Sequence, residues 1–368
     1  MHQKVPFVSF DYQLKVSKNE LFKISNNVFN SGWYVLGPNV NDFENNYKNL
    51  SKVNYAVGVG SGLDALIISL KALNIKKNDE IIVASNAYIA SWLSITNVGA
   101  TIVPIEPDEK TFNIDPFKIE EKITKNTKAI MPVHLFGQPC QMDKIMAIAK
   151  KYNLHIVEDN AQAHLAKFES QITGSFGDIN ATSFYPTKNI GAIGEAGCVT
   201  TNNKELFNYA TKYRNYGSSE KYICDIIGTN SRLDEIQAAI LNVKLKHIQK
   251  WTAERQKIAL LYNERLKGNV TTPYVHPKCS HVYHLYVIKT KYRDDLKSYL
   301  TKKNIETVIH YPIPPHLQKA YKFLNHQKGD FPIAEKLAEQ SLSLPIYPGL
   351  EVDQIDYISD SINEFFKN

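Results

Sequence analysis

The sequence has few cysteines, and none stand at the close spacing that binds zinc or carries out disulfide exchange. Four occur among 368 residues, and they are Cys140, Cys198, Cys224 and Cys279. Without a Cys-x-x-Cys pair we expect no metal site and no redox motif. A disulfide scaffold is implausible in a chain of this length and low cysteine content.

An uninterrupted apolar segment is also missing. Residues 1–7 lack the apolar core of a signal peptide. The 25 residues between Glu80 and Glu106 carry no charge and are long enough to span a bilayer. Polar residues and breakers such as Asn86 and Pro104 interrupt them, so we expect a buried strand–helix–strand. The sequence therefore predicts a cytoplasmic protein with no membrane span.

The chain has no repeat, no low-complexity tract and no block of like charge. Lys and Arg number 43 against 37 Asp and Glu, a net charge of +6. A nucleic-acid-binding protein would cluster its basic residues, so we expect no such partner, whereas an anionic small ligand is allowed. The length favours two domains and permits a large core.

Residues 54–201 alternate short β-rich segments with amphipathic ones. The expected strands are Tyr55–Val59, Glu80–Ala84, Thr101–Ile105, Lys128–Val133, Leu154–Glu158, Ala181–Phe184 and Cys198–Thr200. The expected helices between them are Asp64–Leu73, Tyr88–Val98 and Met142–Tyr152. This alternation predicts an α/β fold with a mainly parallel sheet flanked by helices. Ligands of such sheets bind beyond the carboxyl ends of the strands.

The pattern changes after Asn230. A long, charged helix is expected from Ser231 to about Leu266. The remainder predicts a β-rich segment, a helix, a Pro-rich loop and two further helices, the first three being Val282–Thr290, Arg293–Lys303 and Tyr311–Pro315. We expect a large domain over residues 1–250 and a smaller C-terminal α+β domain over 251–368.

A glycine-rich turn follows the first expected strand. Gly58-Val-Gly60-Ser-Gly62-Leu63 leads from that strand into a helix. Glycines let a ligand approach the backbone, and a helix N-terminus offers free N–H groups to a phosphate. A tight turn without a ligand is an equal alternative. The turn is a weak dinucleotide signal, because the third glycine of that fingerprint is replaced by Leu63.

A pair of carboxylates ends another strand. Glu158 and Asp159 follow apolar residues, and alternation directs their side chains to opposite sides. One of them therefore faces the site expected at this edge. Taken alone, two strand-end carboxylates that form caps or surface ion pairs are the commoner case.

A lysine in an apolar, glycine-rich setting forms the third feature. Lys188 follows an expected strand and a proline, and Gly191, Gly194 and Gly197 come after it. A lysine that attacks a carbonyl must have its ammonium form destabilised, which burial achieves. The alternative is a surface lysine whose stem lies along the protein, which is commoner for lysines in general.

The three features together indicate one chemistry. Pyridoxal phosphate needs a phosphate cradle, an acid beside its pyridine nitrogen and a lysine that forms a Schiff base. Gly60–Leu63, Asp159 and Lys188 supply these in order at the ends of βα units. This conjunction is far more specific than any one of its members.

Five segments carry a resemblance to a known family. They are Ser31-Gly-Trp-Tyr-Val-Leu-Gly37, Gly60-Ser-Gly-Leu-Asp-Ala-Leu66, Glu158-Asp-Asn-Ala-Gln-Ala-His164, Ser183-Phe-Tyr-Pro-Thr-Lys188 and Asn230-Ser-Arg-Leu-Asp-Glu-Ile-Gln-Ala-Ala239. Over almost its whole length the chain resembles the sugar-nucleotide aminotransferases of the DegT/DnrJ/EryC1/StrS type. These enzymes are fold type I pyridoxal-phosphate enzymes, with a seven-stranded sheet in the large domain.

The resemblance implies roles for individual residues. Lys188 looks like the Schiff-base lysine, and Asp159 the partner of the pyridine nitrogen; these two are the expected catalytic residues. The other cofactor contacts implied are Gly62, Leu63 and Ser183 at the phosphate, Gln162 at the phenolic oxygen, Tyr88 on the ring, and Asn230 from a neighbouring subunit. A homodimer with shared active sites is therefore expected.

The resemblance also suggests the substrates. The loop from His310 to Gln318 resembles one in enzymes that act on 3-keto sugars linked to thymidine diphosphate and make 3-amino-3,6-dideoxyhexoses. L-Glutamate is the implied amino donor, and O-antigen or S-layer polysaccharide the implied destination. The expected substrate contacts are Tyr34, Tyr185, His310 and Tyr311.

Other interpretations remain open. The loop at His310 could be a rigid Pro-rich loop with incidental histidines, and the substrate could be a 4-keto sugar nucleotide. An oxidoreductase with NAD at the glycine turn and a non-catalytic regulatory protein on the same scaffold are further alternatives. Leu165 and Asn160 depart from the glycine and alanine of many relatives, which puts the local loop shape and sugar preference in doubt.

Overall fold

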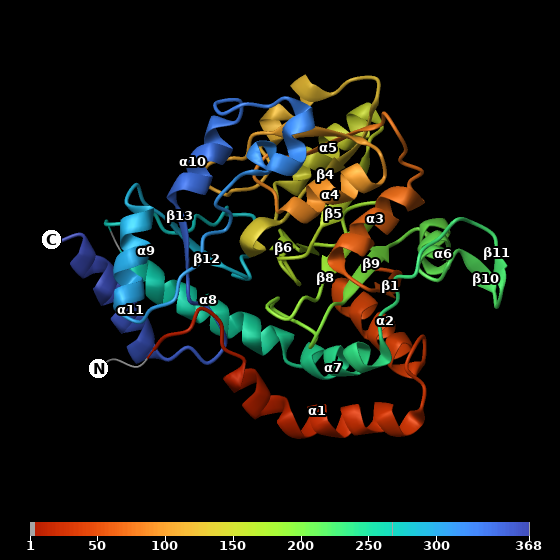
Figure 1. The fold of residues 1–368 in the computed structure, drawn as a ribbon, viewed down its shortest axis with the longest axis horizontal. Helices are drawn as coiled ribbons and strands as arrows, with labels where there is room; N and C mark the ends of the chain where they lie inside the picture. Colours follow the sequence, from red (N-terminus) through yellow and green to blue (C-terminus); the bar gives the residue numbers. More distant parts are fainter. Residues whose placement is uncertain (1–3, 267, 368) are drawn as a thin grey trace.

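The structure is a computed structural model that describes residues 4–266 and 268–367, so residues 1–3 of the N-terminal segment lie outside it. A seven-stranded sheet forms its centre (Figure 1), in the order β1-β9-β8-β5-β4-β2-β3. Its strands are β1 (Tyr55–Val59), β2 (Glu80–Ala84), β3 (Thr101–Ile105), β4 (Thr127–Met131), β5 (His155–Asp159), β8 (Ile179–Ser183) and β9 (Gly197–Thr201). Only β9 runs antiparallel to its neighbours in this sheet. The predicted α/β fold with a mainly parallel sheet is confirmed.

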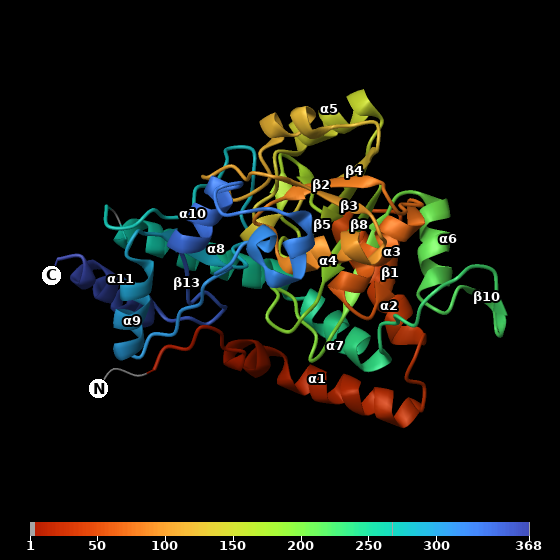
Figure 2. The same ribbon diagram turned by 45° about the horizontal axis from the view of Figure 1, so that its top comes forward.

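Helices flank the sheet and form much of the remaining chain (Figure 2). The α-helices are α1 (Asp11–Ser31), α2 (Pro38–Ser51), α3 (Gly62–Ala72), α4 (Ile89–Asn97), α5 (Met142–Tyr152), α6 (Lys204–Tyr213), α7 (Glu235–Leu245), α8 (Ile248–Arg265), α9 (Arg293–Lys302), α10 (Pro332–Gln340) and α11 (Val352–Phe365). Short 3-10 helices are η1 (Pro116–Lys118), η2 (Glu120–Lys122), η3 (Leu135–Gly137), η4 (Pro315–Leu317) and η5 (Lys319–Leu324). Within the described ranges, no helix is both long enough and apolar enough to cross a membrane.

Within the described part of the chain, three two-stranded sheets lie outside the central one. They pair β6 (Lys167–Phe168) with β7 (Gln171–Ile172), β10 (Ser218–Glu220) with β11 (Ile223–Cys224), and β12 (Tyr286–Lys289) with β13 (Ser341–Leu344). The hairpin of β10 and β11 projects from the body beside α6 (Figure 1). The β-rich segment expected over Val282–Thr290 therefore contains one short strand, and its partner β13 comes from a segment for which no strand was predicted.

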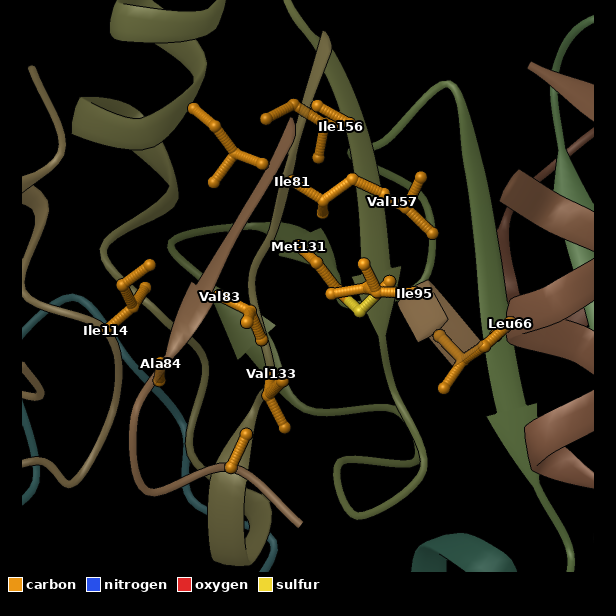
Figure 3. Packing of buried hydrophobic residues seen from close by; sticks show 14 of the residues in the cluster. Leu66, Ile81, Val83, Ala84, Ile95, Ile114, Met131, Val133, Ile156 and Val157 are labelled. Atoms are coloured by element: carbon orange, nitrogen blue, oxygen red, sulfur yellow. The ribbon is translucent and has the colours of Figure 1, made fainter. Parts of the chain in front are cut away.

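The central strands are buried on both faces. Ile81 and Val83 of β2 have no exposed surface, and they pack in one cluster with Met131 of β4, Leu66 of α3 and Ile95 of α4 (Figure 3). Covered parallel strands require apolar residues at successive positions, which explains their continuous hydrophobic runs. This packing fixes the strand ends from which the site is built.

A second apolar cluster gathers the C-terminal elements. It joins residues of α8, β12, α9, β13 and α11, and it includes Val5 from the start of the chain. Val5 forms a parallel bridge with Ile305, so the N-terminal segment packs on C-terminal elements. The described N-terminal segment and helix α11 accordingly lie on the same side of the molecule in Figures 1 and 2. The division at residue 250 stays a prediction.

The single long helix expected over 231–266 is wrong, because two helices, α7 and α8, cover this region. The break is at Lys246 and His247, which form the C-cap of α7 and the N-cap of α8. The His247 ring stacks on Trp251 at 5.2 Å. Helix α7 packs against α2 and α1, and Ile248 and Trp251 at the start of α8 join the same apolar cluster. The later residues of α8 pack in the C-terminal cluster, so α8 connects the two cores.

Candidate active site

A cavity of about 480 Å³ opens beyond the carboxyl ends of the central strands. Ten of the twelve residues predicted for the site line it: Gly62, Leu63, Tyr88, Asp159, Gln162, Ser183, Tyr185, Lys188, His310 and Tyr311. They come from the last residues of β5 and β8, from the loop or helix after β1, β2, β5 and β8, and from the Pro-rich loop of the C-terminal part. The topology therefore brings together residues that lie up to about 250 positions apart in the sequence.

The glycine turn touches the end of β8. A Cβ at Gly62 would lie 2.5 Å from Cβ of Ser183, so only glycine fits there. Ser61 caps helix α3, because its Oγ accepts a hydrogen bond from N–H of Asp64 at 3.1 Å. The first backbone N–H groups of α3 thus lie beside the Ser183 side chain, an arrangement suited to an anion.

Asp159 ends β5 and faces this cavity. It is 5% exposed, and its Oδ2 accepts a hydrogen bond from Oγ of Ser91 at 2.7 Å. Its Oδ1 accepts one from N–H of Ala161 at 3.1 Å. A carboxylate can accept about four hydrogen bonds, so Asp159 keeps capacity for a ligand.

Lys188 lies in the same cavity without a polar partner. Across residues 4–266 and 268–367, no hydrogen bond or ion pair engages its Nζ. The surrounding protein removes water from the ammonium group, and this lowers the pKa of Lys188 from 10.5 to about 8, although the charge of Asp159 opposes the effect. A lysine near this pKa has a substantial neutral fraction close to pH 8, which a nucleophile or a base requires.

The segment that carries Lys188 is anchored on several sides. Nε2 of His164 donates to the carbonyl oxygen of Ser183 at 2.9 Å, while Nδ1 accepts from N–H of Ile190 at 3.2 Å. Burial lowers the pKa of His164 to about 4, so the neutral ring keeps this donor and acceptor pattern. Nζ of the buried Lys244 donates to the carbonyl oxygen of Gly191 at 2.5 Å. These contacts limit where Lys188 can point.

Gln162 is held in one orientation. Its Oε1 accepts from N–H of Phe136 at 2.7 Å, which leaves Nε2 to donate to Oη of Tyr311 at 3.0 Å. The Tyr311 ring lies 5.0 Å from the Tyr88 ring. Amide and hydroxyl hydrogens are therefore available at one wall of the cavity, beside two aromatic faces. His310, the neighbour of Tyr311, is bound through Nδ1 to Oγ of Ser343 at 2.8 Å.

Two predicted site residues do not line this cavity. Tyr34 is 53% exposed and donates to the carbonyl oxygen of Phe29 at 3.2 Å. Asn230 is exposed next to Ser231, whose Oγ accepts from N–H of Gly60 at 3.0 Å. The chain does not fold either side chain into its own cavity, so both roles stay predictions that depend on a second subunit.

The two departures from the family pattern lie behind the site. Leu165 has φ +59°, a left-handed conformation that glycine adopts without strain. Asn160 is buried, and its Nδ2 lies 3.4 Å from Oγ1 of Thr182. Neither residue lines the cavity, so both affect it only through the loop after β5.

Some polar residues at the site were not predicted: Glu195 and His284 line the cavity, whereas Ser91 contacts Asp159 without lining it. Ser91 lies three positions after Tyr88 on α4, so helical spacing could have placed it on the same face. Glu195 belongs to the glycine-rich run after Lys188. His284 lies just before β12, in a segment whose sequence has no ligand-binding signature.

Comparison with known proteins gives consistent matches. Residues 16–363 match the model of the DegT/DnrJ/EryC1/StrS aminotransferase family. The chain is 46% identical over 362 residues to the dTDP-3-amino-3,6-dideoxy-alpha-D-galactopyranose transaminase of Aneurinibacillus thermoaerophilus, covering 98% of this chain and 99% of the relative. It is 42% identical to the dTDP-3-amino-3,4,6-trideoxy-alpha-D-glucose transaminase of Streptomyces venezuelae, covering 98% and 96%.

The fold also matches that of a solved structure over the whole chain. The crystal structure of DesV from S. venezuelae, in complex with a ketimine intermediate, superposes with a TM-score of 0.98 at 41% identity and covers all of both chains. These matches confirm the predicted aminotransferase, and a relative of 30% identity with bound PMP agrees with pyridoxal phosphate as its cofactor. The chain belongs to the DegT/DnrJ/EryC1/StrS aminotransferase family.

Proposed function

We propose that this aminotransferase transfers the amino group of L-glutamate to a dTDP-linked 3-keto-6-deoxyhexose and so forms a dTDP-3-amino-3,6-dideoxyhexose. The observation that carries the proposal is the 46% identity, over nearly the full length of both chains, to a transaminase with a product of this class. We further propose that the enzyme is a cytoplasmic homodimer whose product enters O-antigen or S-layer polysaccharide.

The residues of the cavity fit pyridoxal phosphate. The cradle between the start of α3 and Ser183, where a side chain at position 62 would collide, would hold the phosphate. Asp159 would lie beside the ring nitrogen, and Tyr88 would cover the ring face. Gln162 would donate to the phenolic oxygen with the amide hydrogen that Tyr311 does not use. Bound pyridoxal phosphate supplies an electron sink for the carbanion formed during amino transfer.

Proton transfer falls to Lys188 and its surroundings. In the first half-reaction Nζ of Lys188 removes the proton from Cα of glutamate, and in the second it delivers a proton to the sugar carbon that receives nitrogen. A general base works best when its pKa is near the working pH, and enclosure brings Lys188 to about 8. The negative charge of Asp159 favours the protonated form of the ring nitrogen.

The proposed dimer rests on the two residues that the cavity lacks. Tyr34 and Asn230 lie on the surface, where a second copy of the chain can contact them. If sites are shared, Asn230→Ala should weaken cofactor binding in a dimer, and mixing it with Lys188→Ala chains should restore some activity. Sedimentation and cofactor titration test this; an active monomer with full cofactor affinity would contradict it.

Two half-reactions test the function. The purified protein with pyridoxal phosphate should be yellow and should lose its visible absorbance with L-glutamate. The absorbance should return with a dTDP-3-keto-6-deoxyhexose and, under the proposal, more slowly with 4-keto sugar nucleotides. A clear preference for a 4-keto sugar would overturn the substrate. Lys188→Ala should lower multiple-turnover transamination by about 10³-fold or more, since it removes a general base that acts in both halves.

A further inference from the structure

His284 is a cavity residue to which neither the resemblance nor the proposed mechanism gives a role. It lines the same cavity as Lys188 and is 8% exposed. Burial lowers the pKa of His284 well below 6.5, and the nearby positive charge of Lys188 adds to this effect. The ring is therefore neutral at physiological pH and carries one N–H donor and one bare nitrogen.

The His284 ring has no hydrogen-bond partner among residues 4–266 and 268–367. Its Nδ1 is buried without one. Neighbouring histidines differ, since His164 uses both ring nitrogens and His310 binds Ser343. A buried polar group without a partner requires an explanation, and a ligand in the adjoining cavity provides one.

The unpartnered nitrogen indicates which tautomer is present. A buried N–H without an acceptor is rarer in proteins than a bare acceptor without a donor. Nδ1, which is enclosed, is therefore the bare nitrogen, and the hydrogen lies on Nε2. Because His284 borders the cavity, this N–H is left for an acceptor atom of a bound molecule.

The backbone around His284 is fixed. Nη1 of the buried Arg255 donates to the carbonyl oxygens of Tyr283 at 3.2 Å and Ile346 at 2.8 Å, and lies 3.4 Å from that of His284. Gly137 packs so closely that a Cβ there would lie 2.9 Å from the amide nitrogen of His284. A donor held in this way is preorganised, which is a property of binding residues.

The charges in the cavity indicate the kind of acceptor. Its ionisable lining residues include Lys188 beside the acids Asp159 and Glu195, and no arginine lines it within the described ranges. A neutral imidazole N–H gives no charge-assisted hydrogen bond, so it suits an uncharged oxygen better than a carboxylate. We propose that Nε2–H of His284 binds a hydroxyl oxygen of the substrate sugar, next to the carbon that receives the amino group. This inference rests on the proposed function and extends it.

The two half-reactions separate this role from a general one. His284→Leu should lower kcat/KM of the sugar half-reaction about 10-fold and weaken binding of the dTDP-amino sugar about 10-fold by calorimetry. The glutamate half-reaction and the absorbance of the cofactor-loaded enzyme should change less than about twofold. His284→Gln, whose amide reaches the position of Nε2, should restore most of the loss, whereas His284→Asn should not.

A matched control comes from the same chain. His247 also has an unpartnered buried nitrogen, Nε2, but it does not line the cavity. His247→Leu should leave both half-reactions unchanged. Equal losses in both half-reactions of His284→Leu, or no rescue by His284→Gln, would overturn the role of His284. If the unaltered enzyme reacts with glutamate but aminates no keto sugar nucleotide, the proposed function fails and the ligand assigned to His284 fails with it.

Discussion

Glu158 and Asp159 are consecutive residues at the end of β5, yet their side chains have opposite surroundings. The carboxylate of Glu158 has no exposed surface. It accepts four hydrogen bonds, from Nε2 of His134 at 2.8 Å and from N–H of Gly174 at 2.8 Å, Phe176 at 2.7 Å and Gly177 at 2.9 Å. Asp159 faces the cavity, and among the residues that the structure describes its carboxylate accepts only from Ser91 and Ala161.

The difference separates a structural carboxylate from a functional one. The lone pairs of Glu158 are used by donors of its own chain. N–H of Cys140 donates to Nδ1 of His134, so the ring hydrogen lies on Nε2, which donates to Glu158. Glu158 therefore holds the loops after β4 and before β8 in place. Asp159 retains unused acceptor capacity at a cavity surface, as a cofactor partner requires. Sequence order alone does not distinguish two adjacent acids, whereas their hydrogen bonds do.

Of the two adjacent acids, Asp159 should have the larger effect on function. Asp159→Asn removes the charge beside the ring nitrogen but keeps the shape, so kcat/KM for transamination should fall by about 10²–10³-fold. The free energy of unfolding should change by less than about 1 kcal/mol, because few interactions of the folded chain are lost. Steady-state kinetics and urea unfolding measure the two. Activity close to that of the unaltered enzyme would remove Asp159 from the mechanism.

Glu158→Gln should show the reverse pattern. The side-chain amide of glutamine would point its own N–H hydrogens at groups that donate hydrogen bonds to the carboxylate in the unaltered protein. This clash of donors should cost about 3 kcal/mol of unfolding free energy. Activity at low temperature should stay within a few-fold, since Glu158 does not line the cavity. Glu121→Gln, on the exposed helix η2, is the control and should be neutral. If Glu158→Gln lost as much activity as Asp159→Asn while its free energy of unfolding hardly changed, the two acids would share one function.

The sheet could be predicted because strands buried on both faces appear in the sequence as short continuous hydrophobic runs. The bounds of β1, β2, β3 and α5 match the expected ranges, and β4, β5, β8 and β9 differ by no more than two residues at either end. Helix α1 could not be predicted in this way, because its buried residues are only Gln13, Ser17 and Val28. Its large apolar residues Leu14, Phe22 and Phe29 are exposed, so its sequence marks no face that this chain buries.

The site was predictable where its residues end strands. Asp159 and Ser183 belong to strand ends, and parallel strands bring such ends to one edge. Ser91, which contacts Asp159, comes from a helix face, and the cavity residue His284 comes from a loop of the C-terminal part. Their approach to that edge depends on tertiary packing. Tyr34 and Asn230 could not be placed by one chain at all, since neither lines its cavity.

The burial of Lys188 should make the free energy of unfolding of the cofactor-free protein depend on pH. The folded pKa of Lys188 is about 8, below the ordinary 10.5, so the cost of burying the ammonium is complete below pH 8 and disappears as the pH rises to 10.5. Lys188→Met should therefore be more stable than the unaltered protein by about 2 kcal/mol at pH 7. This advantage should shrink above pH 8.

Chemical unfolding between pH 7 and pH 10 measures the effect. Lys125→Met, in an exposed loop, is the control, and its difference from the unaltered protein should not vary with pH. A Lys188→Met difference that is equally flat would mean that water reaches Nζ freely. The pKa of Lys188 would then be that of a surface lysine, and the cavity would not lower it.

The smallest effect is expected at the other end of β5. Nδ1 of the half-exposed His155 lies 3.4 Å from Oδ2 of Asp178, and this interaction raises the pKa of His155 above 6.5. The pair therefore contributes stability below pH 6.5 that is lost as the pH rises through the raised value. Solvent screens both groups, so His155→Ala should cost less than about 1 kcal/mol at pH 6 and nothing measurable at pH 9. Thermal unfolding at the two pH values tests this. A larger cost at pH 6 would show that an exposed ion pair can stabilise the protein as much as the buried contacts of Glu158. The exposure of a residue would then not predict its contribution to stability at the two ends of β5.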